Sequence, residues 1–271
     1  MTEEVEVFPV TPRDIHAYHF SPDRTVFLGS VHLKDVPGAL SKATAAVANL
    51  GVNLVQSSTS RTSQGSAEWG FFAEADDGHV SPSAIEKGLR ETDLVTDCRV
   101  RGAEGRVLVD TLHYPLRLNA DASAILIRKD VFASTLKFMV ETLGSGGRAL
   151  AYQLGKAAGE SDGTDLINEI GRERLIDNLP EITNLYGAQG WGVTDLVHFS
   201  LHPLDLVIRV EDCFECSGRN SAVPASHFIR GHIAGMMKAC FGKPLESLET
   251  KCISRGDAYC EFHCTESLLG R

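Results

Sequence analysis

Six of the seven cysteines in this chain of 271 residues lie after residue 212, and their spacing is typical of metal ligands. Cys213 and Cys216 form a C-x-x-C, a local chelating motif, while Cys252 and Cys260 flank a turn at Gly256. Clustered cysteines in an intracellular chain indicate metal binding, redox sensing or catalysis more often than structural disulfides. The pattern therefore predicts a metal-binding domain at the C-terminal end.

The turn at Gly256 predicts a hairpin that brings two of these thiols together. Residues directly opposite on antiparallel strands have Cβ atoms about 5 Å apart, so Cys252 and Cys260 could share one ion. Cys264 lies four residues further on, roughly 13 Å along a regular strand, and we exclude it from the site. Glu249 differs from Cys252 in strand parity, so a β-bulge would be needed to turn its carboxylate inward.

Several interpretations of the cysteines stay open at this level. Four thiolates, from Cys213, Cys216, Cys252 and Cys260, would form a closed tetrahedral site of the kind that structural zinc occupies. His227 offers an imidazole that could replace one of them. Without a metal the same residues would be small buried thiols, and the C-x-x-C could instead toggle to a disulfide and release metal.

Composition narrows the classes of function. The net charge of −10 and the pI near 5.5 argue against direct binding to nucleic acid or to an anionic membrane surface. The acidic N-terminus lacks the features of a signal peptide, and no apolar run approaches the roughly 18 residues that span a bilayer. We therefore expect a cytoplasmic protein.

The first half, residues 22–118, alternates strand and helix signals. Alternating apolar residues predict strands near 25–34, 52–55, 67–75 and 95–100. Between them, Leu40, Ala43 and Val47 follow helical spacing, and Ser81-Pro82 provides the cap and first residue of a second helix. The order βαββαβ predicts a ferredoxin-like domain.

Two short motifs in this half resemble those of the ACT domain, a ligand-sensing module that is often dimeric. They are Asp35-x-Pro37-Gly38-Ala39-Leu40 before the first helix and Gly51-x-Asn53 after it. The resemblance implies an amino-acid-type effector or dimerisation, with ligand residues Asp35, Pro37, Gly38, Ala39 and Asn53. Backbone N–H groups at a helix start suit a carboxylate, although turn chemistry alone would select the same residues.

The second half, residues 122–267, predicts an α/β domain with an antiparallel sheet and packed helices. Asp130 is expected to cap a helix that ends at Gly144, and a second helix is expected over 147–159. Strands are predicted over 191–201 and 204–213, an apolar helix over 228–241, and a closing hairpin over 245–265. Gly231 and Gly235 lie one helical turn apart, which permits close packing of the backbone.

This half resembles the 4-vinyl-reductase domain over residues 130–265. The resemblance rests on Phe228-Ile-Arg-Gly-His-Ile-Ala-Gly235, on Phe241-Gly-Lys-Pro244, and on Glu249-Thr-Lys-Cys252-x₇-Cys260-Glu-Phe262. It implies a buried pocket for small, often hydrophobic molecules, dimerisation and a structural zinc. The implied metal set here is Cys216, Glu249, Cys252 and Cys260. The family's remaining cysteine ligand aligns near Ser226, a departure because neutral serine is a poor zinc ligand.

Together these features predict an α+β, two-domain, non-catalytic sensor or regulatory protein. The N-terminal domain would bind an amino-acid-type effector or dimerise, and the C-terminal domain would hold a hydrophobic ligand beside zinc. Trp191, Phe199, Phe228 and Met236 are candidates for lining that pocket, or for plain core packing. Signalling output would need a protein partner. The alternative is an enzyme or enzyme subunit acting on a tetrapyrrole or other hydrophobic substrate, although no nucleophile or phosphate-binding motif supports it.

Overall fold

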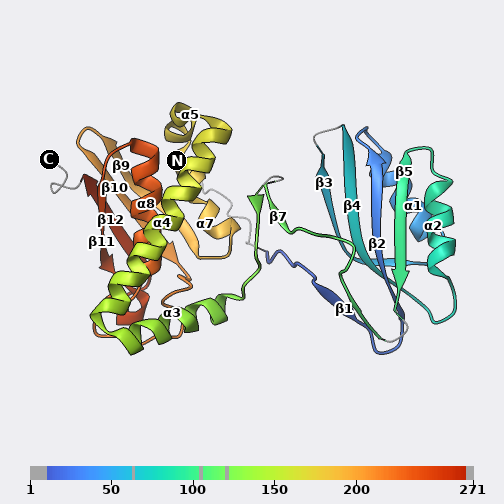
Figure 1. Cartoon of the computed structure of the whole chain (residues 1–271), viewed down its shortest axis with the longest axis horizontal. Helices are drawn as coiled ribbons and strands as arrows, with labels where there is room; N and C mark the ends of the chain where they lie inside the picture. Colours follow the sequence, from blue (N-terminus) through green and yellow to red (C-terminus); the bar gives the residue numbers. More distant parts are fainter. Residues whose placement is uncertain (1–10, 63–64, 104–105, 120–121, 267–271) are drawn as a thin grey trace, which may run out of the picture. The chain divides into compact units, whose positions relative to one another are not determined.

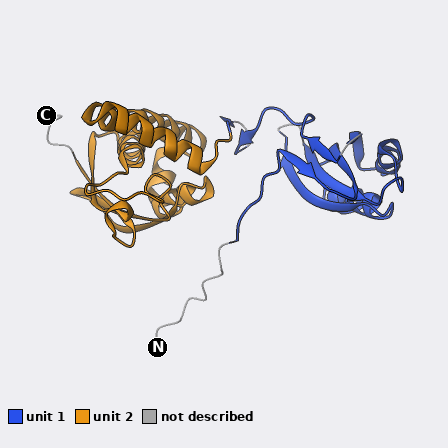
Figure 2. Ribbon diagram, turned by 90° about the horizontal axis from the view of Figure 1, so that it is seen from below, with its two compact units in different colours: residues 1–125 blue, residues 126–271 orange. Residues whose placement is uncertain are grey.

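The chain forms two compact units, residues 1–125 and 126–271 (Figure 2). The computed structural model describes residues 11–62, 65–103, 106–119 and 122–266. Residues 120 and 121 in the expected interdomain boundary, and residue 267 at the expected end of the second domain, lie outside these ranges. Within the described residues, no helix combines the length and apolar character needed to cross a membrane.

The N-terminal unit is built around a four-stranded antiparallel sheet with the order β3-β4-β2-β5 (Figure 1). Six elements follow one another as strand, helix, strand, strand, helix, strand. They are β2 (Thr25–Lys34), α1 (Ala39–Ala48), β3 (Asn53–Arg61), β4 (Ser66–Ala75), α2 (Pro82–Arg90) and β5 (Val95–Gly102). β3 is an edge strand, so one side of its backbone is not paired within the chain.

Both helices of this unit pack on the same face of the sheet. Ile85 and Leu89 of α2 are fully buried against sheet residues that include Trp69 and Phe71. The Phe71 ring lies so close to Gly29 that an added Cβ there would be 2.1 Å from it, which explains a glycine inside a strand. The predicted cap of α2 is confirmed, because the Ser81 hydroxyl accepts a hydrogen bond from the Ala84 N–H.

A small ribbon lies on the other side of this sheet. β1 (Tyr18–Phe20) pairs with β6 (Val107–Val109), and Leu108 packs with Val26, Leu28 and Phe72 in a second apolar cluster. Two further short strands, β7 (Arg117–Leu118) and β8 (Ala122–Ser123), pair in the segment leading to the C-terminal unit. The β-prone stretch 106–118 thus divides between a ribbon strand and the connection.

The C-terminal unit begins with helices. They are α3 (Lys129–Leu143), α4 (Ser145–Ile170), α5 (Arg172–Asp177), α6 (Leu179–Thr183) and α7 (Leu185–Ala188). Two expectations were wrong here. Asp130 does not cap α3, because its carboxylate binds the Arg128 guanidinium and the residue lies in the first turn. The second helix does not end at Gly159 but continues to Ile170.

Glycines in α4 allow it to approach α8 (His227–Phe241) closely (Figure 1). A Cβ on Gly155 would lie 2.0 Å from the Phe228 carbonyl oxygen, and one on Gly231 would lie 2.0 Å from the Tyr152 carbonyl oxygen. The close packing expected around Gly231 is therefore confirmed. It also explains how α4 tolerates glycines that weaken its intrinsic helix propensity.

Four antiparallel strands complete this unit in the order β11-β12-β10-β9. They are β9 (Val193–Leu201), β10 (Leu204–Glu211), β11 (Leu245–Lys251) and β12 (Cys260–Glu266), with a 3₁₀ turn at Ile253–Arg255. Alternate residues of β10 and β12, such as Leu206, Ile208 and Phe262, are buried beneath α8. The structure is therefore a mixed α/β protein with an antiparallel sheet in each unit.

Candidate metal centre

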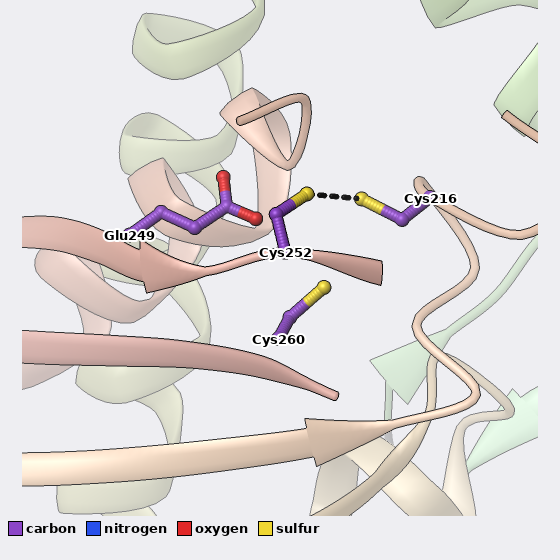
Figure 3. Close-up of side chains that lie close together, drawn as sticks. All are labelled: Cys216, Glu249, Cys252 and Cys260. Carbon is purple, nitrogen blue, oxygen red and sulfur yellow. Dashed lines mark hydrogen bonds between the residues drawn. The ribbon is translucent and has the colours of Figure 1, made fainter. Parts of the chain in front are cut away.

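Four side chains converge at one end of the C-terminal sheet (Figure 3). Glu249 lies near the end of β11, Cys252 follows that strand, Cys260 begins β12, and Cys216 comes from the loop after β10. Each offers one ligand atom, and these four atoms lie within 4.8 Å of one another. All four residues are buried. The structure thus brings together the four residues that the resemblance implied.

A β-bulge turns Glu249 toward the thiols. Glu249 pairs with Phe262, but Lys251 pairs with Glu261, so Thr250 is an extra residue in β11. Thr250 is exposed, whereas Glu249 and Cys252 are both buried. The extra residue changes the parity of the strand, and this is the irregularity that the sequence required for an inward Glu249.

The donor atoms are held by short contacts. The Sγ atoms of Cys216 and Cys252 are 3.3 Å apart, and the Ala225 N–H points to the Cys252 sulfur at 3.5 Å. The Ile253 N–H points to the Cys260 sulfur at 3.4 Å. Backbone N–H groups directed at sulfur favour the thiolate form, which is the form that binds metal.

Ser226 occupies the place where the sequence departs from the family pattern. Its Oγ lies 2.8 Å from the Cys216 sulfur and 3.6 Å from the Cys260 sulfur. Its backbone N–H donates to Oε2 of Glu249 at 3.1 Å. Ser226 therefore contacts three of the four candidate ligands. A neutral hydroxyl in this position orients the donors and need not replace any of them.

The charges of this cluster call for a cation. Hydrogen bonds from the Cys216 and Cys260 thiols hold the pKa of Cys252 well below its usual range. Burial, followed by the interaction with Cys252, raises the pKa of Glu249 to about 8. Oε1 of Glu249 is buried and has no hydrogen-bond partner among the described residues. Crowded acids of this kind ionise together only beside a positive charge.

The residues fit zinc in number and in type. Three sulfurs and one carboxylate oxygen form a four-donor set of the kind found in closed zinc sites. Zinc bound there would cross-link the loop after β10 to the β11–β12 hairpin. No water would be needed to complete a four-coordinate shell, so the arrangement suits a structural role.

The other candidate ligands lie outside this set of four. Cys213 is buried, with its sulfur 3.5 Å from the Ser226 hydroxyl. Burial and the charges of Arg230, Arg148 and Arg219 lower the pKa of His227 to about 4, which keeps its imidazole neutral. Cys264 faces Ser247 across β11 and β12, and burial raises its pKa to about 12.

Sequence reasoning missed Glu215, inside the C-x-x-C. Its carboxylate is fully buried and accepts hydrogen bonds from the Phe228 and Ile229 N–H groups, each at 3.0 Å. Burial raises its pKa to about 7, against the opposing effect of these two N–H groups. Glu215 thus caps α8, whose residue Ser226 makes no side-chain cap. An acidic residue before a helix that lacks its own cap was the available signal.

An aromatic cluster surrounds a buried polar pair further along α8. The Tyr186 hydroxyl lies 2.9 Å from Nδ1 of His232, whose Nε2 lies 3.0 Å from Asp162. The ring centres of Trp191 and Phe228 lie 4.7 and 6.4 Å from that of the same imidazole. Two more residues were expected to line a pocket. Met236 contacts Tyr186 through its sulfur, whereas Phe199 packs on Phe241.

The five ligand residues predicted in the N-terminal unit do not meet within one chain. Asp35 forms an ion pair with Arg61, at the end of β3, with a distance of 2.7 Å. Asn53 begins the same strand, so it lies at the opposite end of the sheet. Gly38 adopts a left-handed conformation with φ of 86°, consistent with the tight turn before α1.

A shallow hollow of about 840 Å³ lies elsewhere on this unit. It is lined by residues at the end of α1 and at the start of α2, including Asn49, His79 and Ser81. None of the five predicted ligand residues lines it. The hollow therefore adds nothing to the expected effector site at residues 35–39.

Residues 206–266 match the 4-vinyl-reductase domain family, and this stretch contains all four candidate ligands. The chain is 28% identical over 139 residues to the uncharacterised protein MJ0150 of Methanocaldococcus jannaschii, covering 51% of this chain and 75% of that one. It is 32% identical over 95 residues to MJ1642 of the same organism, covering 35% of this chain and 56% of the relative.

Two solved structures resemble part of this chain at low sequence identity. The phenol-responsive sensory domain of the transcription activator PoxR is 19% identical with a TM-score of 0.47, covering 54% of this chain and 78% of that one. A vinyl-4-reductase family protein from Methanocaldococcus jannaschii is 17% identical with a TM-score of 0.41, covering 53% and 84%.

Proposed function

We propose that this protein is a non-catalytic small-molecule sensor whose C-terminal unit binds a small apolar effector beside a structural zinc. The observation that carries the proposal is the buried set of three thiols and one carboxylate, with its unpaired Glu249 oxygen. Such a set without a cation would leave buried polar groups uncompensated, at a cost in folding free energy. The match to the 4-vinyl-reductase domain family supports the assignment to small-molecule sensing.

The metal centre and the aromatic cluster are connected through α8. Cys216 would hold the metal, and the adjacent Glu215 caps the first turn of α8. His232 lies farther along the same helix, between Tyr186 and Asp162. We assign the effector to the Tyr186–His232 region, where rings of Trp191 and Phe228 provide an apolar surface and the imidazole a polar contact. Zinc would keep the start of α8 in place.

For the N-terminal unit we propose an ACT-like, ferredoxin-like regulatory domain. An amino-acid-type effector would bind through its carboxylate at the loop of residues 35–39. Because Asn53 lies at the far end of β3, it could join that loop only from a second copy paired along the β3 edge. Signalling output would then pass through a protein partner, in the cytoplasm, without direct contact to nucleic acid or membrane.

The metal part of the proposal is tested by elemental mass spectrometry of tag-free protein purified under reducing conditions. We expect about one zinc per chain in the wild type and none in Cys252→Ser. Cys264→Ser is the matched control, because it is an equally buried thiol in the same sheet but outside the four-donor set. Absence of zinc from the wild type, or equal loss in both variants, would refute the assignment.

The effector part is tested on zinc-loaded protein with a panel of small aromatic and aliphatic compounds. A bound compound stabilises the folded state by mass action, so we expect a saturable rise in melting temperature. It should also change the fluorescence of Trp191, and Trp191→Phe would remove that signal while Trp69 remains. If no compound class shifts either signal, the sensing role fails even where the zinc is confirmed.

A further inference from the structure

α3 presents an uncharged face to solvent. Val131, Thr135 and Phe138 follow the spacing of one helical face, and Ser134 and Thr142 lie beside them. All five are exposed. The opposite face of α3, with the buried Leu136, packs into the core of the C-terminal unit. α3 therefore carries uncharged residues on both sides, whereas a surface helix normally turns charged residues to solvent.

Apolar exposure continues into the segment just before the helix. Phe138 is 70% exposed and Val131 45% exposed, and the adjacent Leu126 and Ile127 are 60% and 54% exposed. Lys137 and Glu141 lie on one flank of this stripe, where they pair with each other. One aromatic and three aliphatic side chains are thus presented together with the charges set to one side.

The size of this surface fits a second copy of the chain. A fully exposed aromatic side chain offers roughly 200 Å², and the four apolar residues together expose roughly 400 Å². A standard interface buries about 800 Å² on each subunit, and about 65% of a homodimer interface is apolar, or roughly 500 Å². We propose that the α3 stripe, defined by Leu126, Ile127, Val131 and Phe138, is the dimer interface of this protein.

Charge placement selects an antiparallel pairing about a two-fold axis. With the axis near Ser134, Phe138 packs against Val131 of the partner subunit, and the small serine lets the two helices approach. The flanks that then meet are the same flank of each helix, which brings Lys137 near Asp130 of the partner subunit. A parallel pairing would bring the charged flank against an uncharged one. The inference requires neither zinc nor an effector.

Sedimentation of the full chain tests this interface. We expect the wild type to be a dimer at micromolar concentration, and Val131→Glu combined with Phe138→Glu to weaken association about 100-fold or more, as loss of two central residues does. Leu248→Glu is the matched control, since Leu248 is 61% exposed on β11 of the same unit, and this variant should remain dimeric. Circular dichroism should be unchanged in all three proteins.

Cross-linking gives an independent test that does not depend on a destabilising charge. All seven native cysteines are buried, so a short bismaleimide should react with an introduced surface thiol. Ser134→Cys near the axis should cross-link two chains, and Ser161→Cys on the exposed side of α4 should not. A monomeric wild type, an unweakened double variant, or cross-linking through Ser161→Cys alone would overturn the proposal. A monomer would mean that α3 is covered within its own chain.

Discussion

The two units share a plan, a four-stranded antiparallel sheet covered by helices, but they differ in what they bury. Ten polar or charged residues are buried among those that the structure describes, and Ser21 is the one that belongs to the N-terminal unit. The other nine, including Glu215, Glu249 and His232, lie in the C-terminal unit. One core is therefore apolar, while the other holds groups that require specific partners.

This difference separates two ways of stabilising a similar architecture. Apolar burial depends on area and shape and works without any bound group. A buried carboxylate or thiolate is unfavourable unless hydrogen bonds or an opposite charge compensate it. We therefore expect the N-terminal unit to be stable without a bound group, and the C-terminal unit to depend on what occupies the cluster of Cys216, Glu249, Cys252 and Cys260.

Removal of metal should give the largest effect and should fall on one unit. Structural zinc contributes on the order of 10 kcal/mol or more in small domains. In calorimetry of the full chain, a strong chelator with reductant should lower or abolish the unfolding transition of the C-terminal unit. The transition of the N-terminal unit should not move.

A Cys252→Ser variant provides the control for chelation. Its C-terminal transition should already resemble that of chelated wild type, and added chelator should change nothing further. Equal loss of both transitions would contradict the contrast between the two cores. So would a C-terminal transition that chelator leaves in place in zinc-loaded protein.

A core substitution in the N-terminal unit should have an intermediate effect that is independent of metal. Phe71 is 1% exposed and packs against Gly29 and Trp69, so Phe71→Ala removes a large ring from a close-packed core. We expect a loss of about 3–5 kcal/mol in the free energy of unfolding. Denaturant titration with and without chelator measures it, and a cost that changes with chelator would show that the two units are not independent.

The smallest effect is expected at a helix cap in the same unit. The Ser81 hydroxyl accepts from the Ala84 N–H at the start of α2. Ser81→Ala should cost about 1 kcal/mol, while Ser81→Asp should retain most of the stability. Thermal denaturation distinguishes these variants. Equal losses in both would mean that the cap contributes through packing and not through its hydrogen bond.

Local patterns predicted those elements whose signals are contained within a few residues. Ser81-Pro82 specified the start of α2 because capping acts within one helical turn. α4 was predicted too short because its glycines disfavour helix in isolation, and their reason for being there is the backbone of α8. Asp130 resembled a cap, but a guanidinium two residues away competes for its carboxylate.

The candidate site shows the same division. Cys252 and Cys260 could be placed opposite each other from the hairpin turn, because register follows from turn position. Glu249 depended on a bulge that strand parity required but could not locate, and the structure places it at Thr250. The contributions of Ser226 and Glu215 were missed, since their partners lie 10 or more residues away along the chain.

The amino-acid sequence by itself determined the residue types of the metal cluster, the strand and helix periodicity, and the glycines that permit close helix packing. Only the tertiary structure decided which cysteines approach Glu249, that Glu215 caps α8, and that the N-terminal ligand residues lie at opposite ends of their sheet. The reason is physical. Propensity and periodicity act over a few residues, whereas burial, charge compensation and strand pairing depend on segments that meet only when the chain folds.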